Sequence, residues 1–214
     1  MTPEALIRSA TSWEAVPLVG EINLLTAAAP SGLWELWQQS GRDGPPFWAF
    51  PWAGGQALAR YVLDNPGIVR GRRVLDVASG SGLVAIAAAK AGAAGVVAGD
   101  IDPNAVAAIA INASANGVRV TGRAFDMAAM DPGGAEVVLA GDVFYQRELA
   151  ELALGFLVDA ARSGADVLVA DPGRAFLPAA SLTPVAGYEV PVLDTIEDAP
   201  VKTVTVYRLS HPRL

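Results

Sequence analysis

The strongest constraint on how this chain can fold is an alternation of helical and extended segments that begins near residue 54. Several segments have the apolar spacing of amphipathic helices, and five short apolar runs that alternate with them are typical of buried strands. Such alternation predicts a parallel, doubly wound sheet, because parallel neighbours need a crossover between them. The expected helices cover residues 54–65, 83–91, a segment that starts at Pro103 after an Asp102 cap, and 146–162, and the expected strands cover 73–77, 95–98, 118–121, 136–140 and 166–170.

The alternation stops after residue 170. Residues 187–193 and 201–209 read as two strands with no helix between them, so this pair must be antiparallel. The predicted fold is therefore α/β: a Rossmann-like, doubly wound, seven-stranded mixed sheet with a C-terminal antiparallel hairpin. We expect one domain over residues 1–214, with residues 1–53 as an N-terminal cover and residues 54–214 as the core.

Composition restricts the kinds of partner and cofactor. The net charge of −7 argues against a nucleic-acid partner, since a phosphate backbone needs a basic face. The chain has no cysteine and one histidine, His211, near the C-terminus, so we expect no disulfide, no metal site and no Ser-His-Asp triad, and no role for His211. Uninterrupted apolar runs such as 83–89 are far shorter than a membrane span, and an N-terminus with Glu4 and Glu14 resembles no signal or transit peptide. We expect a cytoplasmic protein without a membrane partner, monomeric or weakly dimeric, and thirteen arginines against two lysines favour a bacterial source.

The string VLDVASGSGLVA places Gly80 and Gly82 in the turn between the first parallel strand and its helix. Glycines there permit close backbone approach and free the helix N-terminal amides for a ligand, although the pattern alone also fits a dinucleotide site. Asp76 would repel a pyrophosphate but suits an ammonium group, and Asp100, after the next strand, can bind both ribose hydroxyls. These positions, with a terminal hairpin that dinucleotide domains lack, predict S-adenosylmethionine. The alternative is that the two aspartates only cap turns.

The order strand, Asp76-x-Ala-x-Gly-x-Gly, strand, Asp100 resembles the class I, seven-strand methyltransferases. Their usual pattern is acid-x-Gly-x-Gly-x-Gly, and Ala78 stands here at the first glycine, which calls for an αR or β backbone at that residue. The strings FWAFPWAGGQALARYVLDNP, GDVFYQRELAE and ADPGR look more narrowly like the electron-transfer-flavoprotein β-subunit lysine methyltransferase family and its bacterial relatives. Together with the glycine turn, they cover residues 47–174.

The resemblance implies roles for particular residues. Asp142 and Tyr145, in an Asp-x-x-Tyr motif after the fourth strand, would line the lysine channel, Asp142 accepting a hydrogen bond from the amine and Tyr145 orienting it. The alternative is that Asp142 caps the helix near Gln146, with Phe144 and Tyr145 in the core. The cofactor would be bound by these residues: Trp52, Asp76, Ala78, Ser79, Gly80, Gly82, Asp100, Ile101, Asp126 and Gly141.

Three further segments bear on the substrate side. The aromatic segment FWAFPWAGG, residues 47–55, is either core or a lid in which Trp52 packs near the methionine end and Trp48 or Phe50 faces a cationic substrate. Residues 171–174 either shape the substrate mouth or form an ordinary Pro-Gly turn. Where the family often reads Glu-Ile-Arg-Leu-His, this chain has Asn23 and Leu25 in place of the two basic residues, which would alter preference if that segment touches substrate.

The predicted function is S-adenosylmethionine-dependent N-methylation of a protein lysine, with the electron-transfer-flavoprotein β subunit as the expected substrate. Two alternatives stay open. The first is methylation of a small molecule or a ribosomal protein with the same cofactor, and the second is a non-catalytic domain that binds S-adenosylmethionine.

Overall fold

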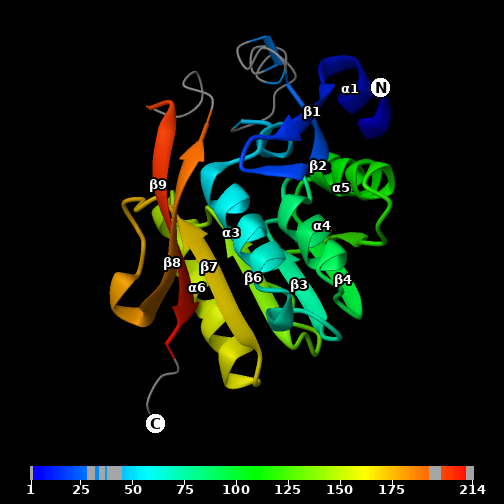
Figure 1. The fold of residues 1–214 in the computed structure, drawn as a ribbon. Helices are drawn as coiled ribbons and strands as arrows, with labels where there is room; N and C mark the ends of the chain where they lie inside the picture. The colour runs from blue at the N-terminus through cyan, green and yellow to red at the C-terminus, as the bar shows by residue number, and fades with distance from the viewer. Residues whose placement is uncertain (1, 28–31, 34–36, 38–44, 193–198, 211–214) are drawn as a thin grey trace.

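The centre of the molecule is a seven-stranded sheet with the order β5-β4-β3-β6-β7-β9-β8 (Figure 1). The computed structural model describes residues 2–27, 32–33, 37, 45–192 and 199–210. The first five strands in this order are parallel, and β9 runs antiparallel to both of its neighbours. The predicted mixed sheet with a terminal hairpin is confirmed. The strands are β3 (Arg73–Val77), β4 (Gly95–Asp100), β5 (Thr121–Ala124), β6 (Val137–Gly141), β7 (Asp166–Asp171), β8 (Leu182–Pro191) and β9 (Val201–Leu209).

Helices cover both faces of the sheet. The helices α3 (Ala53–Asp64), α4 (Leu83–Lys90) and α5 (Pro103–Ala115) share one apolar core with residues such as Leu139 of β6. The neighbouring Val138 points the other way, into a second core with α6 (Arg147–Arg162). This two-residue alternation along a strand buried on both sides is what a doubly wound sheet requires. No helix in the described part of the chain has the length and apolarity needed to cross a bilayer.

The N-terminal part forms a small separate layer. Helix α1 (Pro3–Ala10) precedes a two-stranded antiparallel sheet of β1 (Ser12–Val16) and β2 (Val19–Thr26), which lies near α5 above the carboxyl ends of the central strands (Figure 1). Asn112 of α5 and Asn116, the C-cap of this helix, bind the backbone of β2. The Leu25 amide donates to Asn112 Oδ1 at 3.0 Å, and the Asn23 amide donates to Asn116 Oδ1 at 3.1 Å. Asn112 also donates to the Ser81 carbonyl at 2.8 Å, so this layer is tied to the glycine turn.

The predicted starts of two strands are wrong. The third strand begins at Thr121 rather than Val118, because the Val118 amide donates to the Ala113 carbonyl and closes the end of α5. Strand β8 begins at Leu182, before the predicted residue 187, in a stretch whose pairing is irregular between Pro184 and Ala186. Leu193, its predicted end, lies outside the described residues, as does His211.

Helical spacing in the sequence predicts that Val106, Ile109, Ala110 and Ala113 form the apolar face of α5, and this prediction is partly wrong. Ala110 is exposed, and the polar Asn112 is buried instead. The oxygen and the nitrogen of the Asn112 side-chain amide each have a backbone partner, which compensates its burial. Apolar periodicity alone cannot detect a buried polar residue of this kind.

Candidate active site

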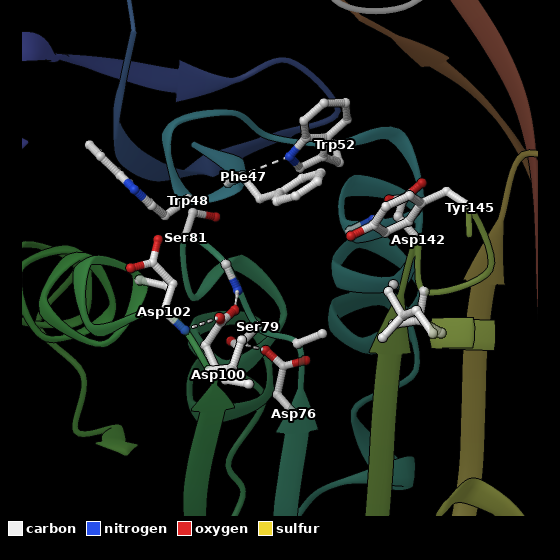
Figure 2. A pocket seen from close by; sticks show the side chains of 18 of the residues that line it. Phe47, Trp48, Trp52, Asp76, Ser79, Ser81, Asp100, Asp102, Asp142 and Tyr145 are labelled. Atoms are coloured by element: carbon white, nitrogen blue, oxygen red, sulfur yellow. Dashed lines mark hydrogen bonds between the residues drawn. The ribbon is translucent and has the colours of Figure 1, made fainter. Parts of the chain in front are cut away.

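A cavity of about 750 Å³ opens at the carboxyl ends of β3, β4 and β6, within the usual size range of small-molecule sites. Open parallel sheets bind ligands at this edge. Figure 2 shows Asp76 and Asp100 on one side of the cavity, Asp142 and Tyr145 on the other, and the rings of Phe47 and Trp52 above. The cavity therefore has acidic residues on two sides. The sequence predicts that Asp76 and Asp100 bind the cofactor, and that Asp142 with Tyr145 binds the acceptor lysine.

The first side is built on β3, β4 and the glycine turn. The Asp100 carboxylate accepts from the Gly80 amide at 2.8 Å and from the Asp102 amide at 3.0 Å. The Asp76 carboxylate accepts from the Ser79 hydroxyl and from the Ala85 amide. Both donors to Asp76 are neutral, and burial raises the pKa of this carboxyl to about 7. A cationic ligand group beside Asp76 would stabilise its ionised form.

The glycine turn departs from prediction at Ala78. Its φ is +51°, in the left-handed region, rather than the expected αR or β conformation. The first glycine of the usual motif supplies this conformation at no steric cost, whereas alanine holds it against a Cβ clash. Asp142, at the end of β6, is the other non-glycine residue with positive φ in the described part of the chain, at +57°. Both lie in the cavity wall, where backbone strain commonly collects.

The second side is centred on Asp142. Its Oδ2 accepts from the Gly55 amide at the start of α3, at 3.0 Å, and its Oδ1 accepts from Arg174 Nη2 at 2.9 Å. The alternative that Asp142 caps α6 is wrong, since α6 has Gln146 at its N-cap and no side-chain cap. Burial raises the pKa of the Asp142 carboxyl, and Arg174 acts in the opposite direction. The carboxylate is thus held between a helix N-terminus and a guanidinium.

Tyr145 faces the cavity, whereas its neighbour Phe144 is core. Phe144 is buried against α6, which confirms that part of the alternative reading. Tyr145 lines the cavity, with its ring centroid 5.3 Å from that of Phe47. Burial raises the pKa of the Tyr145 hydroxyl above its ordinary value, so this hydroxyl keeps its proton and can donate.

The rings of the aromatic segment divide between the core and the cavity wall. Trp48 and Phe50 are 0 % and 2 % exposed and belong to the N-terminal core, although both also touch the cavity. Phe47 and Trp52 are only half-buried, and the Trp52 indole donates to the Phe47 carbonyl at 2.9 Å. The ring beside Tyr145 is therefore Phe47, which the sequence did not single out for the substrate side.

Most residues predicted for the site line this one cavity. They are Trp52, Asp76, Ala78, Ser79, Gly80, Asp100, Ile101, Asp126, Gly141, Asp142 and Tyr145. Gly82 does not line it: its left-handed φ of +85° starts α4, and an added Cβ would lie 3.2 Å from Ile109 Cγ1. Asn23 and Leu25 do not line it either, Asn23 being exposed and Leu25 buried in the N-terminal core.

Several lining residues were not predicted to contact a ligand. They include Ser81, Phe125, Met127 and Leu149. Phe125 directly follows the edge strand β5, whose boundaries were misplaced, and this explains why it was missed. Residues 171–174 form the expected turn, in which Asp171 Oδ1 accepts from the amides of Gly173 and Arg174. Arg174 also lines the cavity, and a role at the substrate mouth stays a prediction.

The chain was compared with known proteins. The family model described as ribosomal protein L11 methyltransferase (PrmA) matches residues 56–141. The electron transfer flavoprotein beta subunit lysine methyltransferase of Xenopus laevis is 41 % identical over 179 residues, which cover 81 % of this chain and 71 % of that protein. The chain belongs to this family. The Mus musculus protein of the same name is 42 % identical over 145 residues, 65 % of this chain and 54 % of the mouse protein, so the match spans about half of that relative.

A solved structure agrees with the fold of this methyltransferase. The RNA methyltransferase from Salinibacter ruber in complex with S-adenosyl-L-homocysteine has a TM-score of 0.50 and 21 % identity, covering 74 % of this chain and 94 % of that one. At this identity the likeness shows the shared α/β architecture and carries nothing about the substrate.

The cavity of this family member fits S-adenosylmethionine in its donor set. Asp76 is a buried carboxylate whose two hydrogen-bond donors are both neutral, which suits an ammonium group. Asp100 keeps lone pairs beyond its two amide donors, and it could accept from ribose hydroxyls. Ile101 is 74 % exposed although large and apolar, as expected of a side chain that would cover a purine. Asp126 accepts from the Ala128 amide through Oδ1, which leaves Oδ2 for an amino group.

Proposed function

We propose that this chain is an S-adenosylmethionine-dependent N-methyltransferase that acts on a lysine of the electron-transfer-flavoprotein β subunit. The observation that carries the proposal is the opposition of two acidic centres, Asp76 with Asp100 and Asp142 with Tyr145, within one cavity. Membership of the lysine methyltransferase family supports the substrate, because that is the protein its relatives are named for.

S-adenosylmethionine supplies a methyl group on a sulfonium, which a neutral amine can attack in line. The residues of this chain must then hold the two reactants close and aligned, and no strong base is needed. Asp76, Asp100 and the backbone of the Ala78–Gly80 turn would fix the cofactor end. Phe47 and Trp52 would place π faces near the positive charge of the sulfonium and exclude water from it.

The acceptor side is assigned to the other wall. Asp142 would accept a hydrogen bond from the lysine amine, and its position is fixed by Gly55 and Arg174. Tyr145 would flank the amine with its ring and donate through its hydroxyl. The half-buried Phe47 ring would close this side of the acceptor site.

The finer expectations from composition belong to the same proposal. We infer a bacterial, cytoplasmic enzyme that works as a monomer or weak dimer, with residues 1–53 acting as a cover on a core of residues 54–214. The acidic net charge of −7 supports a protein substrate over a nucleic acid.

Labelled methyl transfer tests the proposal. The purified protein is incubated with isotopically labelled S-adenosylmethionine and a lysate of the source organism, and the labelled products are identified by mass spectrometry. We expect label on a lysine of the flavoprotein β subunit, and we expect Asp142→Ala to abolish labelling while calorimetry shows retained cofactor binding. Label on a small molecule alone would contradict the proposed protein substrate and favour small-molecule methylation. Absence of saturable cofactor binding would contradict the proposed activity itself.

A further inference from the structure

Arg174 is the one arginine or lysine among the described residues that line the cavity. Its guanidinium lies on the Asp142 carboxylate, with Nη2 at 2.9 Å and Nε at 3.3 Å from the same oxygen, Oδ1. Both side chains are largely buried, at 21 % and 11 % exposure, so solvent screens the pair weakly. The contact therefore sets the charge of the site where the acceptor amine is expected.

The position of Arg174 is fixed by the end of β7. The Arg174 amide donates to Asp171 Oδ1 at 2.6 Å, within the turn that follows this strand. Asp142 is fixed from the opposite direction, because its Oδ2 accepts from Gly55 at the N-terminus of the twelve-residue helix α3. Three donor contacts already occupy the Asp142 carboxylate, which leaves room for about one more by its lone-pair count.

An unpaired carboxylate would be a poor acceptor site for methyl transfer. It would favour the ammonium form of lysine, which has no lone pair with which to attack. A carboxylate already neutralised by a guanidinium can still accept a hydrogen bond from an amine, but it gives the ammonium form much less stabilisation.

We propose that Arg174 is a positioning residue that neutralises Asp142, so that the cavity receives the acceptor lysine as a neutral amine. The inference rests on the proposed lysine methyltransferase activity. It adds that Arg174 determines the protonation state of the acceptor lysine in that site. Lysine ordinarily loses its proton near pH ~10.4. An unpaired carboxylate beside it would raise that pKa, whereas a carboxylate paired with a guanidinium raises it much less.

The other charged or titratable groups around the acceptor position act against Arg174. Asp171, from the end of β7, adds negative charge near Asp142. Asp100, across the cavity, and the Tyr145 hydroxyl are the remaining titratable groups that interact on this side. Among these groups Arg174 alone opposes protonation of an incoming amine. Its removal should therefore raise the pKa of the bound lysine.

The first test compares variants by their pH–rate profiles under single-turnover conditions. Arg174→Gln is expected to move the alkaline rise in rate upward by about 1 to 3 pH units and to lower the rate near neutral pH at least tenfold, with recovery at high pH. Arg174→Lys keeps the charge and should stay close to wild type. Arg147→Gln, at an exposed arginine of α6 that does not line the cavity, is the matched control and should not shift the profile. An equal loss of rate at every pH for Arg174→Gln would show that Arg174 has only a structural role, and it would overturn the inference.

The second test needs neither a variant nor methyl transfer. Calorimetry measures binding of Nα-acetyl-lysine methylamide to the wild-type protein in the presence of S-adenosylhomocysteine, from neutral pH to about pH 10. Affinity should rise with pH as the probe loses its proton. Affinity that is flat or falls with pH, or an absence of binding, overturns the inference. A pH-dependent rise without any methylated lysine would instead refute the proposed function alone.

Discussion

At the scale of single residues, Ala78 shows most directly how this site departs from its family pattern. Its left-handed φ of +51° is the conformation that the usual glycine adopts freely. We expect Ala78→Gly to raise the free energy of unfolding by about 0.5 to 1 kcal/mol, since relief of the Cβ clash exceeds the added entropy of the unfolded chain. Urea denaturation measures this, with Ala110→Gly on the exposed face of α5 as a control that should lose about as much. A loss of stability at Ala78 would show that its methyl group stabilises the turn by packing.

Asp76 gives a pH dependence whose sign can be worked out. Its pKa is raised from 3.8 to about 7 by burial, so between these values the unfolded chain is ionised while the folded one is protonated. The free energy of unfolding of the cofactor-free protein should therefore fall as pH rises through this window. Cofactor affinity should change in the opposite direction, because a cationic ligand group binds the ionised carboxylate.

Asp76→Asn separates these two effects. It should stabilise the cofactor-free protein above pH 7 by about 2 to 4 kcal/mol, and it should weaken S-adenosylmethionine binding at least tenfold. Thermal denaturation and calorimetry at several pH values measure both quantities. A variant that loses stability but binds the cofactor normally would show that Asp76 has only a structural role.

At the scale of elements, the start of α3 depends on two adjacent glycines with different surroundings. A Cβ on Gly54 would lie 2.5 Å from the Ala170 carbonyl oxygen and 2.6 Å from Asp142 Oδ2, whereas a Cβ on Gly55 would meet only Leu83 Cδ2, at 3.9 Å. Gly54→Ala should force α3 away from the sheet and lower the free energy of unfolding by about 2 to 4 kcal/mol. Gly55→Ala should be neutral or stabilising by up to about 1 kcal/mol, as alanine is the better helix former. Chemical denaturation compares the two, and equal effects would contradict this packing.

Elements with strong local signals could be predicted from the sequence, and those fixed by distant partners could not. Strand β3 and strand β9 were predicted to the residue because a buried apolar run or a β-branched alternation defines them. Strand β5 was misplaced because a turn that closes α5 precedes it, and the N-terminal elements had no prediction at all. In the site, Asp76 and Asp100 were predictable from their spacing to the glycines. The Arg174 contact was not, since it joins loops after β6 and β7 that lie 32 residues apart in sequence.

At the scale of the whole molecule, the N-terminal segment and the carboxyl ends of the sheet strands line the same cavity. Trp52 is the junction residue: it is the N-cap of α3, and its ring contacts Phe47 and Phe50. Trp52→Ala should weaken S-adenosylmethionine binding about tenfold, as expected for loss of a π face near a cation. The loss of free energy of unfolding should be smaller than this loss of binding free energy. Trp13→Ala, on β1 outside the cavity, is the matched control for cofactor affinity, and a purely destabilising effect of Trp52→Ala would assign Trp52 to the core.

Peptide-resolved mass spectrometry of the purified electron-transfer-flavoprotein β subunit is the most direct test of the proposed activity. The subunit is incubated with S-adenosylmethionine and either the wild-type protein or Asp142→Ala. We predict methyl groups on lysine with the wild-type protein and none with the variant, while calorimetry shows that both bind the cofactor. An unmodified subunit with an active, cofactor-bound wild-type protein would contradict the proposed substrate, and lysine methylation that persists in Asp142→Ala would contradict the proposed site.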